Sequence, residues 1–224
     1  LNYQGKQIWL DPTLINQTGS LSNLYQPDYG YALVLKSSEN KLTSMAGPSD
    51  GSYTHIAENY FIPKKHEQKV KLSVVTQYSG EKLLNTLARL ERDGKKKVAD
   101  NYEIYYQKAF PSLVSVGEMT VSVDDKEGTV SINEQYEIEH YWRTGDEHYE
   151  ADYYPTEVRD AVFKPEQIIR TAPLALAFPN NINNHFEVTF ESDGWDFDDE
   201  EFVEDNPFFS FHKTISFKAN TLKL

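Results

Sequence analysis

Strict alternation of apolar and polar residues is the feature that most constrains the fold of this chain. Met119, Val121 and Val123 alternate with polar residues up to a turn-like Asp-Asp-Lys-Glu-Gly segment, and the alternation resumes from residue 130 to residue 138. A period of two places successive side chains on opposite faces of a strand, so the pattern predicts a β-hairpin with one buried face. Further strands are predicted over residues 31–35, 53–62, 69–76, 174–178, 186–190, 209–217 and 221–224.

A helical insertion interrupts this strand pattern. Ser79 is a suitable N-cap, and leucines spaced three or four residues apart follow it. Gly94 interrupts the helical period and Pro111 ends it, so two helices, or one broken helix, are expected near residues 80–110. A short helix is also expected over 156–163. These elements predict a mainly β, α+β fold, namely an antiparallel β-sandwich-like domain with a two-helix insertion.

Domain organisation follows from composition. Residues 11–52 are rich in Gly, Ser, Asn and Pro and have a single apolar segment, which is typical of a long surface connection. We therefore expect residues 51–224 to form the folded β-rich unit, with residues 1–50 as a separate leading part. Residues 143–154 and the acidic residues 193–205 are predicted to be loops.

Charge and cysteine content exclude several classes of function. The 35 Asp and Glu against 22 Lys and Arg give a net charge of −13, which repels nucleic acid and anionic lipid surfaces. No apolar segment approaches the roughly 20 residues of a spanning helix, so no membrane insertion is expected. The chain has no cysteine, which excludes disulfides, thiolate metal sites and a cysteine nucleophile within it.

Two groups of polar residues are candidates for metal binding. Eight carboxylates lie between Asp193 and Asp205, but their spacing does not match an EF-hand, and a solvated acidic loop explains them more simply. His140 and His148, with two nearby glutamates, carry zinc-type ligands, but nothing in their spacing fixes a coordination geometry. We therefore predict no metal and no other cofactor.

Aromatic residues in the predicted loop 143–154 and just before it are candidates for ligand binding. Tyr141, Trp142 and Tyr149 belong to this group, and a loop position is less easily explained by core packing than a strand position is. One alternative for the chain is therefore a β-sandwich module that binds a glycan or a peptide.

Asp11 is the candidate catalytic residue. The segment Lys-Gln-Ile-Trp-Leu-Asp-Pro-Thr reads as a strand that stops at Asp11, because Pro12 cannot donate to a ladder. A carboxylate at a strand end can orient a histidine, and it can equally cap a turn, as Asx-Pro sequences often do. Both readings stay open on the residues alone.

The opening segment resembles a known family. QGKQIWLDPT followed by SLSNLYQPDYGYALVL is similar to the end of the catalytic core in bacterial transglutaminase-like proteins that carry a domain of unknown function ahead of that core. The later segments also resemble the C-terminal region of that group, and the similarity runs over nearly the whole chain. These segments are GEKLLNTLARLERDGKKKVADNYEIYYQKAFP, INEQYEIEHYW and KPEQIIRTAPLALAFP.

The resemblance implies a role for Asp11. In that superfamily a cysteine, a histidine and an aspartate act in this chain order, and Asp11 falls on the aspartate position. It further implies that residues 1–50 are the end of a transglutaminase-like core, that the rest is an accessory domain, and that the upstream core of the same polypeptide is its partner. The chain alone is expected to be inactive, as part of an exported or periplasmic bacterial cysteine protease or acyltransferase. A structural domain of a degenerate enzyme is the other alternative.

Overall fold

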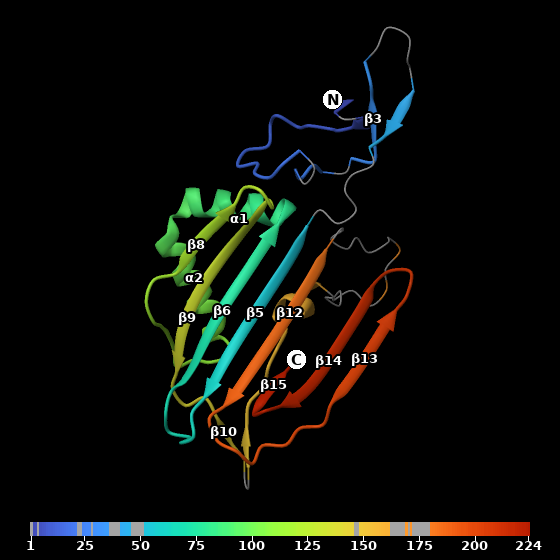
Figure 1. Ribbon diagram of the computed structural model, residues 1–224. Helices are drawn as coiled ribbons and strands as arrows, with labels where there is room; N and C mark the ends of the chain where they lie inside the picture. The colour runs from blue at the N-terminus through green and yellow to red at the C-terminus, as the bar shows by residue number, and fades with distance from the viewer. Residues whose placement is uncertain are drawn as a thin grey trace.

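The chain folds around one large open sheet (Figure 1). The computed structural model describes residues 2–3, 5–21, 24–27, 29–35, 41–45, 52–145, 148–161, 169, 171 and 180–224. Within them, strands predominate over helices, and the predicted mainly β, α+β class is confirmed. No helix in these residues is both long and apolar enough to cross a lipid bilayer.

The large sheet contains nine strands in the order β13-β14-β15-β12-β5-β6-β9-β7, with β8 also paired to β9. The strands of this sheet are β5 (Tyr53–Ile62), β6 (Val70–Ser79), β7 (Leu113–Ser115), β8 (Thr120–Asp124), β9 (Thr129–Ile138), β12 (Asn181–Phe190), β13 (Glu200–Asp205), β14 (Ser210–Lys218) and β15 (Thr221–Lys223).

Pairing in the sheet is antiparallel at every join except one. The predicted hairpin is β8–β9, in which Val121 lies opposite Ile132, and the predicted pair β5–β6 is also antiparallel. The exception is β12, which runs parallel to β5 over ten residue pairs, from Asn181 opposite Tyr53 to Phe190 opposite Ile62. The sheet is therefore mixed. Strand β12 lies near its centre although it comes from a distant part of the chain.

The predicted helical insertion is α1 (Gly80–Asp93) followed by α2 (Lys95–Gln107). The break falls at Gly94, whose φ of 79° lies in the region that favours glycine. Ser79 is the N-cap residue of α1, but its hydroxyl accepts a hydrogen bond from the Tyr53 backbone N–H and makes no cap bond. The third helix is α3 (Thr156–Ala161).

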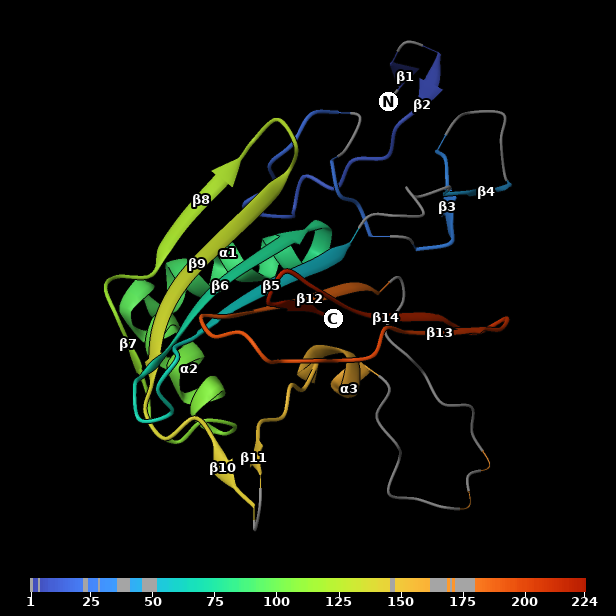
Figure 2. The same cartoon turned by 60° about the horizontal axis from the view of Figure 1, so that its bottom comes forward.

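The two faces of the sheet differ because all three helices lie on the same side (Figure 2). The residues that face the helices are buried and mostly apolar, and they form the core together with aromatic residues from residues 141–153 and 195–197. The opposite face, called the open face below, carries mainly polar side chains such as His55, Ser73, Gln77 and Asn183. This division follows the period of two read from the sequence.

The amino-terminal segment contributes short hairpins outside the large sheet. Strands β1 (Asn2–Tyr3) and β2 (Lys6–Gln7) pair with each other, as do β3 (Tyr31–Leu33) and β4 (Leu42–Ser44). The nine-stranded sheet uses only residues from Tyr53 onwards.

Two loop predictions need correction, and one predicted strand falls outside the described residues. The acidic residues 193–205 are not all loop, since β13 occupies Glu200–Asp205 at the sheet edge, where solvent accommodates its charges. Residues 143–154 contain a small hairpin of β10 (Arg143–Thr144) and β11 (Tyr149–Glu150). The strand expected at 174–178 lies outside the described residues.

Candidate functional site

The strand expected to end at Asp11 stops at Gln7, and Asp11 lies in a turn after three non-strand residues. Its Oδ1 accepts hydrogen bonds from the Thr13 backbone N–H at 2.9 Å and from the Thr13 hydroxyl at 2.6 Å. These bonds stabilise the charged form and hold the pKa of Asp11 below its ordinary value. Asp11 Oδ2 accepts a long hydrogen bond of 3.5 Å from the Tyr29 hydroxyl. One carboxylate oxygen is thus fixed by the Asx turn, and the other is left with a weak partner.

The two sequence motifs of the family resemblance meet around Asp11. Its backbone N–H donates to Gln26 Oε1 at 2.6 Å, and the Gln26 side chain is oriented by a 2.8 Å bond from its Nε2 to the Tyr25 carbonyl. Tyr29, which lies three residues further on, supplies the hydroxyl near Oδ2. The WLDPT and QPDYGY motifs are therefore in contact through the hydrogen bonds of Asp11 with Gln26 and Tyr29.

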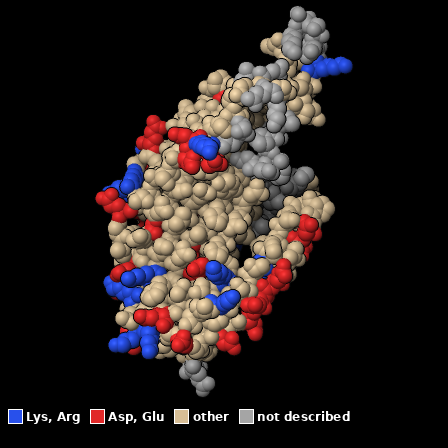
Figure 3. All heavy atoms as spheres, in the orientation of Figure 1, with Lys and Arg blue, Asp and Glu red and all other residues tan. Residues whose placement is uncertain are grey.

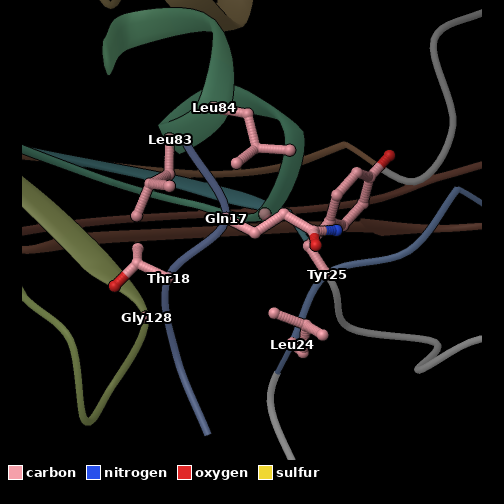
Figure 4. A pocket seen from close by; sticks show the side chains of 8 residues that line it. Gln17, Thr18, Leu24, Tyr25, Leu83, Leu84 and Gly128 are labelled. Carbon is pink, nitrogen blue, oxygen red and sulfur yellow. The ribbon is translucent and has the colours of Figure 1, made fainter. Parts of the chain in front are cut away.

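The segment after Asp11 packs on the sheet domain at the start of α1 (Figure 4). Gln17, Thr18 and Tyr25 from this segment meet Leu83 and Leu84 of α1 around a cavity of about 10 Å³. Gln17 Nε2 is buried there and has no hydrogen-bond partner among the described residues. A cavity of this size holds at most one water molecule, which would satisfy this amide. The contact fastens the Asp11 segment to the large domain.

The three predicted binding aromatics differ in burial, although the Tyr141 and Trp142 rings are in contact at 5.1 Å. Tyr141 is only 4% exposed and stacks on Phe110 at 5.5 Å, so it is a core residue. Its hydroxyl is hydrogen-bonded to that of Tyr153. Tyr141 is thus buried although it was predicted to lie next to a loop, because aromatic residues from 141–153 pack against the helix side of the sheet.

Trp142 and Tyr149 do come together, at 6.2 Å between ring centroids. His66 stacks on Tyr149 at 4.2 Å, and Trp195 stacks on Trp142 at 5.7 Å with nearly parallel rings. Tyr149 is 49% exposed, whereas both tryptophans are half-buried. We call Trp142, Tyr149, His66 and Trp195 the aromatic cluster; it offers a partly exposed ring surface of the kind that binds apolar ligand faces.

A second polar group lies inside the domain, on the helix side of the sheet. Glu58 of β5 and Glu134 of β9 both lie level with Val74 of the intervening strand β6. Each glutamate accepts a hydrogen bond from the tyrosine two residues later, Tyr60 at 2.7 Å and Tyr136 at 2.6 Å. Glu58 is 7% exposed and Glu134 is 5% exposed. The two strands thus carry matching Glu-x-Tyr pairs in the core.

Burial strongly perturbs both carboxyl groups. The pKa of Glu58 is raised to about 7, mainly by desolvation and also by the charge of Glu134, while the Tyr60 hydroxyl and the nearby Asn184 amide lower it. Desolvation also raises the pKa of Glu134 to about 7, opposed by the Tyr136 hydroxyl and the Arg89 guanidinium. Both groups are therefore able to hold or release a proton near neutral pH.

The positive charge of Arg89, on α1, lowers the pKa of Glu134. Its Nη2 donates to the Tyr102 hydroxyl at 2.6 Å, and its guanidinium lies 5.0 Å from the Tyr102 ring centroid. Three buried atoms here have no hydrogen-bond partner among the described residues, namely Glu134 Oε2, Arg89 Nε and Asn184 Nδ2. Such atoms in native proteins usually bind ordered water.

Sequence reasoning missed this buried pair, although a signal was present. Glu58 and Glu134 occupy inward positions in otherwise apolar alternations, between Ile56 and Tyr60 and between Ile132 and Tyr136. A carboxylate at an inward strand position is rarely buried without a specific partner.

Several of the residues weighed for metal binding have other partners. Asp193 accepts from the Asn220 amide at 2.6 Å, and Glu200 pairs with Lys213 at 2.6 Å. His148 is hydrogen-bonded to Glu150 at 2.7 Å, and His140 is exposed. Within the described part of the chain, no three His, Asp or Glu side chains are grouped so that they could hold a metal ion.

Comparison of the chain with protein-family models, with curated proteins and with solved structures finds no significant match. The functional assignment therefore depends on the sequence motifs and on the geometry described above.

Proposed function

We propose that this chain is the accessory C-terminal region of a transglutaminase-like protein. In this proposal Asp11 is the orienting carboxylate of a Cys-His-Asp triad, and residues 51–224 form a non-catalytic domain that supports the segment bearing it. The chain has no cysteine, so acyl transfer or amide hydrolysis belongs to the intact protein. An exported, periplasmic location in a bacterium is part of the same proposal.

The observation that carries the proposal is the environment of Asp11. A triad carboxylate must be ionised and fixed in direction while keeping one oxygen available for the histidine N–H. The Thr13 bonds to Oδ1 meet the first two requirements, and the long Tyr29 contact at Oδ2 is readily displaced. Gln26 and Tyr29, which belong to the second motif of the resemblance, support this geometry, so both motifs contribute to one arrangement.

The test is replacement of Asp11 in the complete protein that contains the upstream core. We expect Asp11→Ala to lower kcat for amide hydrolysis or acyl transfer about 10³- to 10⁴-fold, because the histidine loses its orienting partner. Asp100→Ala is the matched control, since Asp100 is an exposed carboxylate on α2 paired with Lys96 alone among the described residues. Full activity of the Asp11→Ala protein would contradict the triad assignment.

A second candidate function is ligand binding through the aromatic cluster. The observation that favours it is the convergence of Trp142 and Tyr149 with His66 and Trp195 at one end of the domain. Half-exposed stacked rings suit the apolar face of a sugar or an aromatic peptide side chain.

A further inference from the structure

The buried pair Glu58 and Glu134 lies on the side of the sheet that the helices cover. Both side chains are at most 7% exposed. Val74 alone separates them in the strand register, and neighbouring strands are about 4.8 Å apart, so the two backbones are about 10 Å apart. Two ionised carboxylates at this separation repel each other, because a protein interior screens charge weakly.

Positive charge acts on one member of the pair. Arg89 of α1 lowers the pKa of Glu134. The groups that lower the pKa of Glu58 are the Tyr60 hydroxyl and the Asn184 amide, and neither of them is a cation. Ionisation of both carboxyl groups therefore buries more negative charge than Arg89 balances, which is costly in a protein interior.

The other titratable groups around the pair supply no positive charge. Burial raises the pKa of each nearby tyrosine, so these side chains stay neutral near pH 7. They are Tyr78 of β6, Tyr102, Tyr105 and Tyr106 of α2, and Tyr141 and Tyr153 of the 141–153 segment. Glu103 of α2 raises the pKa of Tyr136, and Glu157 and Asp160 of α3 raise that of Tyr105. These acidic groups add to the negative charge around the pair.

Many other carboxylates of the domain are exposed to solvent. Figure 3 shows acidic side chains gathered along the edge of the sheet at β13, where every residue is exposed. Water stabilises those charges, whereas Glu58 and Glu134 are shielded from it. Ionisation of the pair therefore acts against the packing that keeps water out.

Both helices contact the pair or its direct partners. Arg89 of α1 donates to the Tyr102 hydroxyl of α2 at 2.6 Å, so this hydrogen bond joins the two helices. The Tyr106 ring of α2 lies 5.4 Å from the ring of Tyr136, which donates to Glu134. Glu134 Oε2 and Arg89 Nε are buried without a hydrogen-bond partner among the described residues. Water that enters between the helices and the sheet would hydrate both atoms, and it would stabilise the carboxylate most when ionised.

The first helix also contacts the segment that follows the Asp11 turn. Gln17 and Leu84 line the small cavity between this segment and α1. Asn16 Nδ2 donates to Glu91 of α1 at 3.4 Å. A displacement of α1 from the sheet therefore changes the support of the Asp11 segment.

We propose that Glu58 and Glu134 form a pH switch in the core of the domain. The protonated pair holds α1 and α2 on the sheet, and ionisation of the pair releases these helices locally while the sheet stays folded. Release of α1 also weakens its contact with the Asp11 segment. The switch itself depends on the sheet domain alone, whereas its effect on Asp11 chemistry rests on the proposed function.

The direction of the switch follows from the two protonation equilibria. The pKa of each carboxyl group is raised from 4.5 to about 7 in the packed state. The bound proton therefore stabilises the packing fully below pH 4.5, and this stabilisation is lost as pH rises to about 7. Release of the helices is thus favoured at pH 8 over pH 5.

The test is amide hydrogen exchange, read by mass spectrometry, of the full chain and of a Glu58→Gln, Glu134→Gln double variant. Comparison of the two proteins at the same pH cancels the pH dependence of chemical exchange. The ratio of exchange rates, unmodified chain over variant, should rise about 10- to 100-fold for α1 and α2 amides between pH 5 and pH 8. One carboxyl group whose pKa falls from about 7 to 4.5 on opening produces a change of this size.

Glu118→Gln is the matched control, since the Glu118 side chain is 93% exposed, and it should leave exchange unchanged at both pH values. Amides of β5 and β6 should show no comparable rise. The proposal is overturned if the ratio for α1 and α2 is the same at both pH values. It is equally overturned if β5 and β6 show the same rise as the helices, which would indicate global unfolding.

The single variant Glu134→Gln keeps the hydrogen bond from Tyr136 and gives the same comparison if the double variant does not fold. Exchange in residues 14–21 should rise together with that of α1, and constant protection there would refute the link to the Asp11 segment. None of these measurements needs catalytic activity, so their outcome is independent of the Asp11 test in the complete protein.

Discussion

Replacement of the buried Glu134 by glutamine should stabilise the protein at alkaline pH. Glutamine has nearly the same shape, and its Oε1 still accepts the 2.6 Å hydrogen bond from the Tyr136 hydroxyl. What the substitution removes is a carboxyl group that is 5% exposed and carries a charge at high pH. The change therefore isolates the cost of ionising this site.

The magnitude follows from the two protonation equilibria. The carboxyl pKa is raised from 4.5 to about 7 in the folded state, a difference equivalent to about 3 kcal/mol of folding free energy. Because the folded pKa is the higher one, the stabilising proton is fully bound below pH 4.5, and the stability it contributes is lost as pH rises to about 7. Glu134→Gln should leave stability nearly unchanged at pH 4.5 and increase it by about 3 kcal/mol at pH 8.

Urea unfolding at pH 4.5 and pH 8, followed by tryptophan fluorescence, measures this difference. For a domain of this size, about 3 kcal/mol corresponds to a rise in Tm of roughly 6–12 °C at pH 8. Glu118→Gln is the control, since the Glu118 side chain is 93% exposed and should show no such pH dependence. An equal loss of stability for Glu134→Gln at both pH values would refute the reasoning, because it would mean that the carboxylate is stabilised by the fold.

Two further outcomes are expected. Gly94→Ala should lower the free energy of unfolding by about 1–3 kcal/mol, because Gly94 has φ 79° and ψ 152°, and a Cβ there meets no atom within 4 Å; the cost is thus backbone strain alone. Urea unfolding measures it, and unchanged stability would contradict the assigned backbone strain. Trp142→Ala should abolish saturable binding of cell-wall glycan fragments or peptides if the aromatic cluster is a binding site; binding that survives would exclude Trp142 from it.

Local sequence patterns determined much of the fold. The alternation around β8 and β9, the capping position at Ser79 and the break at Gly94 each depend on a few neighbouring residues, and each is found where it was predicted. The Asp-Pro sequence allowed either a strand end or a turn at Asp11, and the structure has the turn, in which Thr13 holds the carboxylate. These features are predictable because steric preferences and short-range hydrogen bonds decide them.

Contacts between distant residues were decided only by the tertiary structure. The sequence does not reveal that β12 lies parallel to β5, from which it is separated by more than a hundred residues. Nor does it state that Tyr141 is buried, or that Glu58 and Glu134 lie level across β6. Strand order depends on how whole faces pack to exclude water, and the local period is the same whichever strand becomes the neighbour.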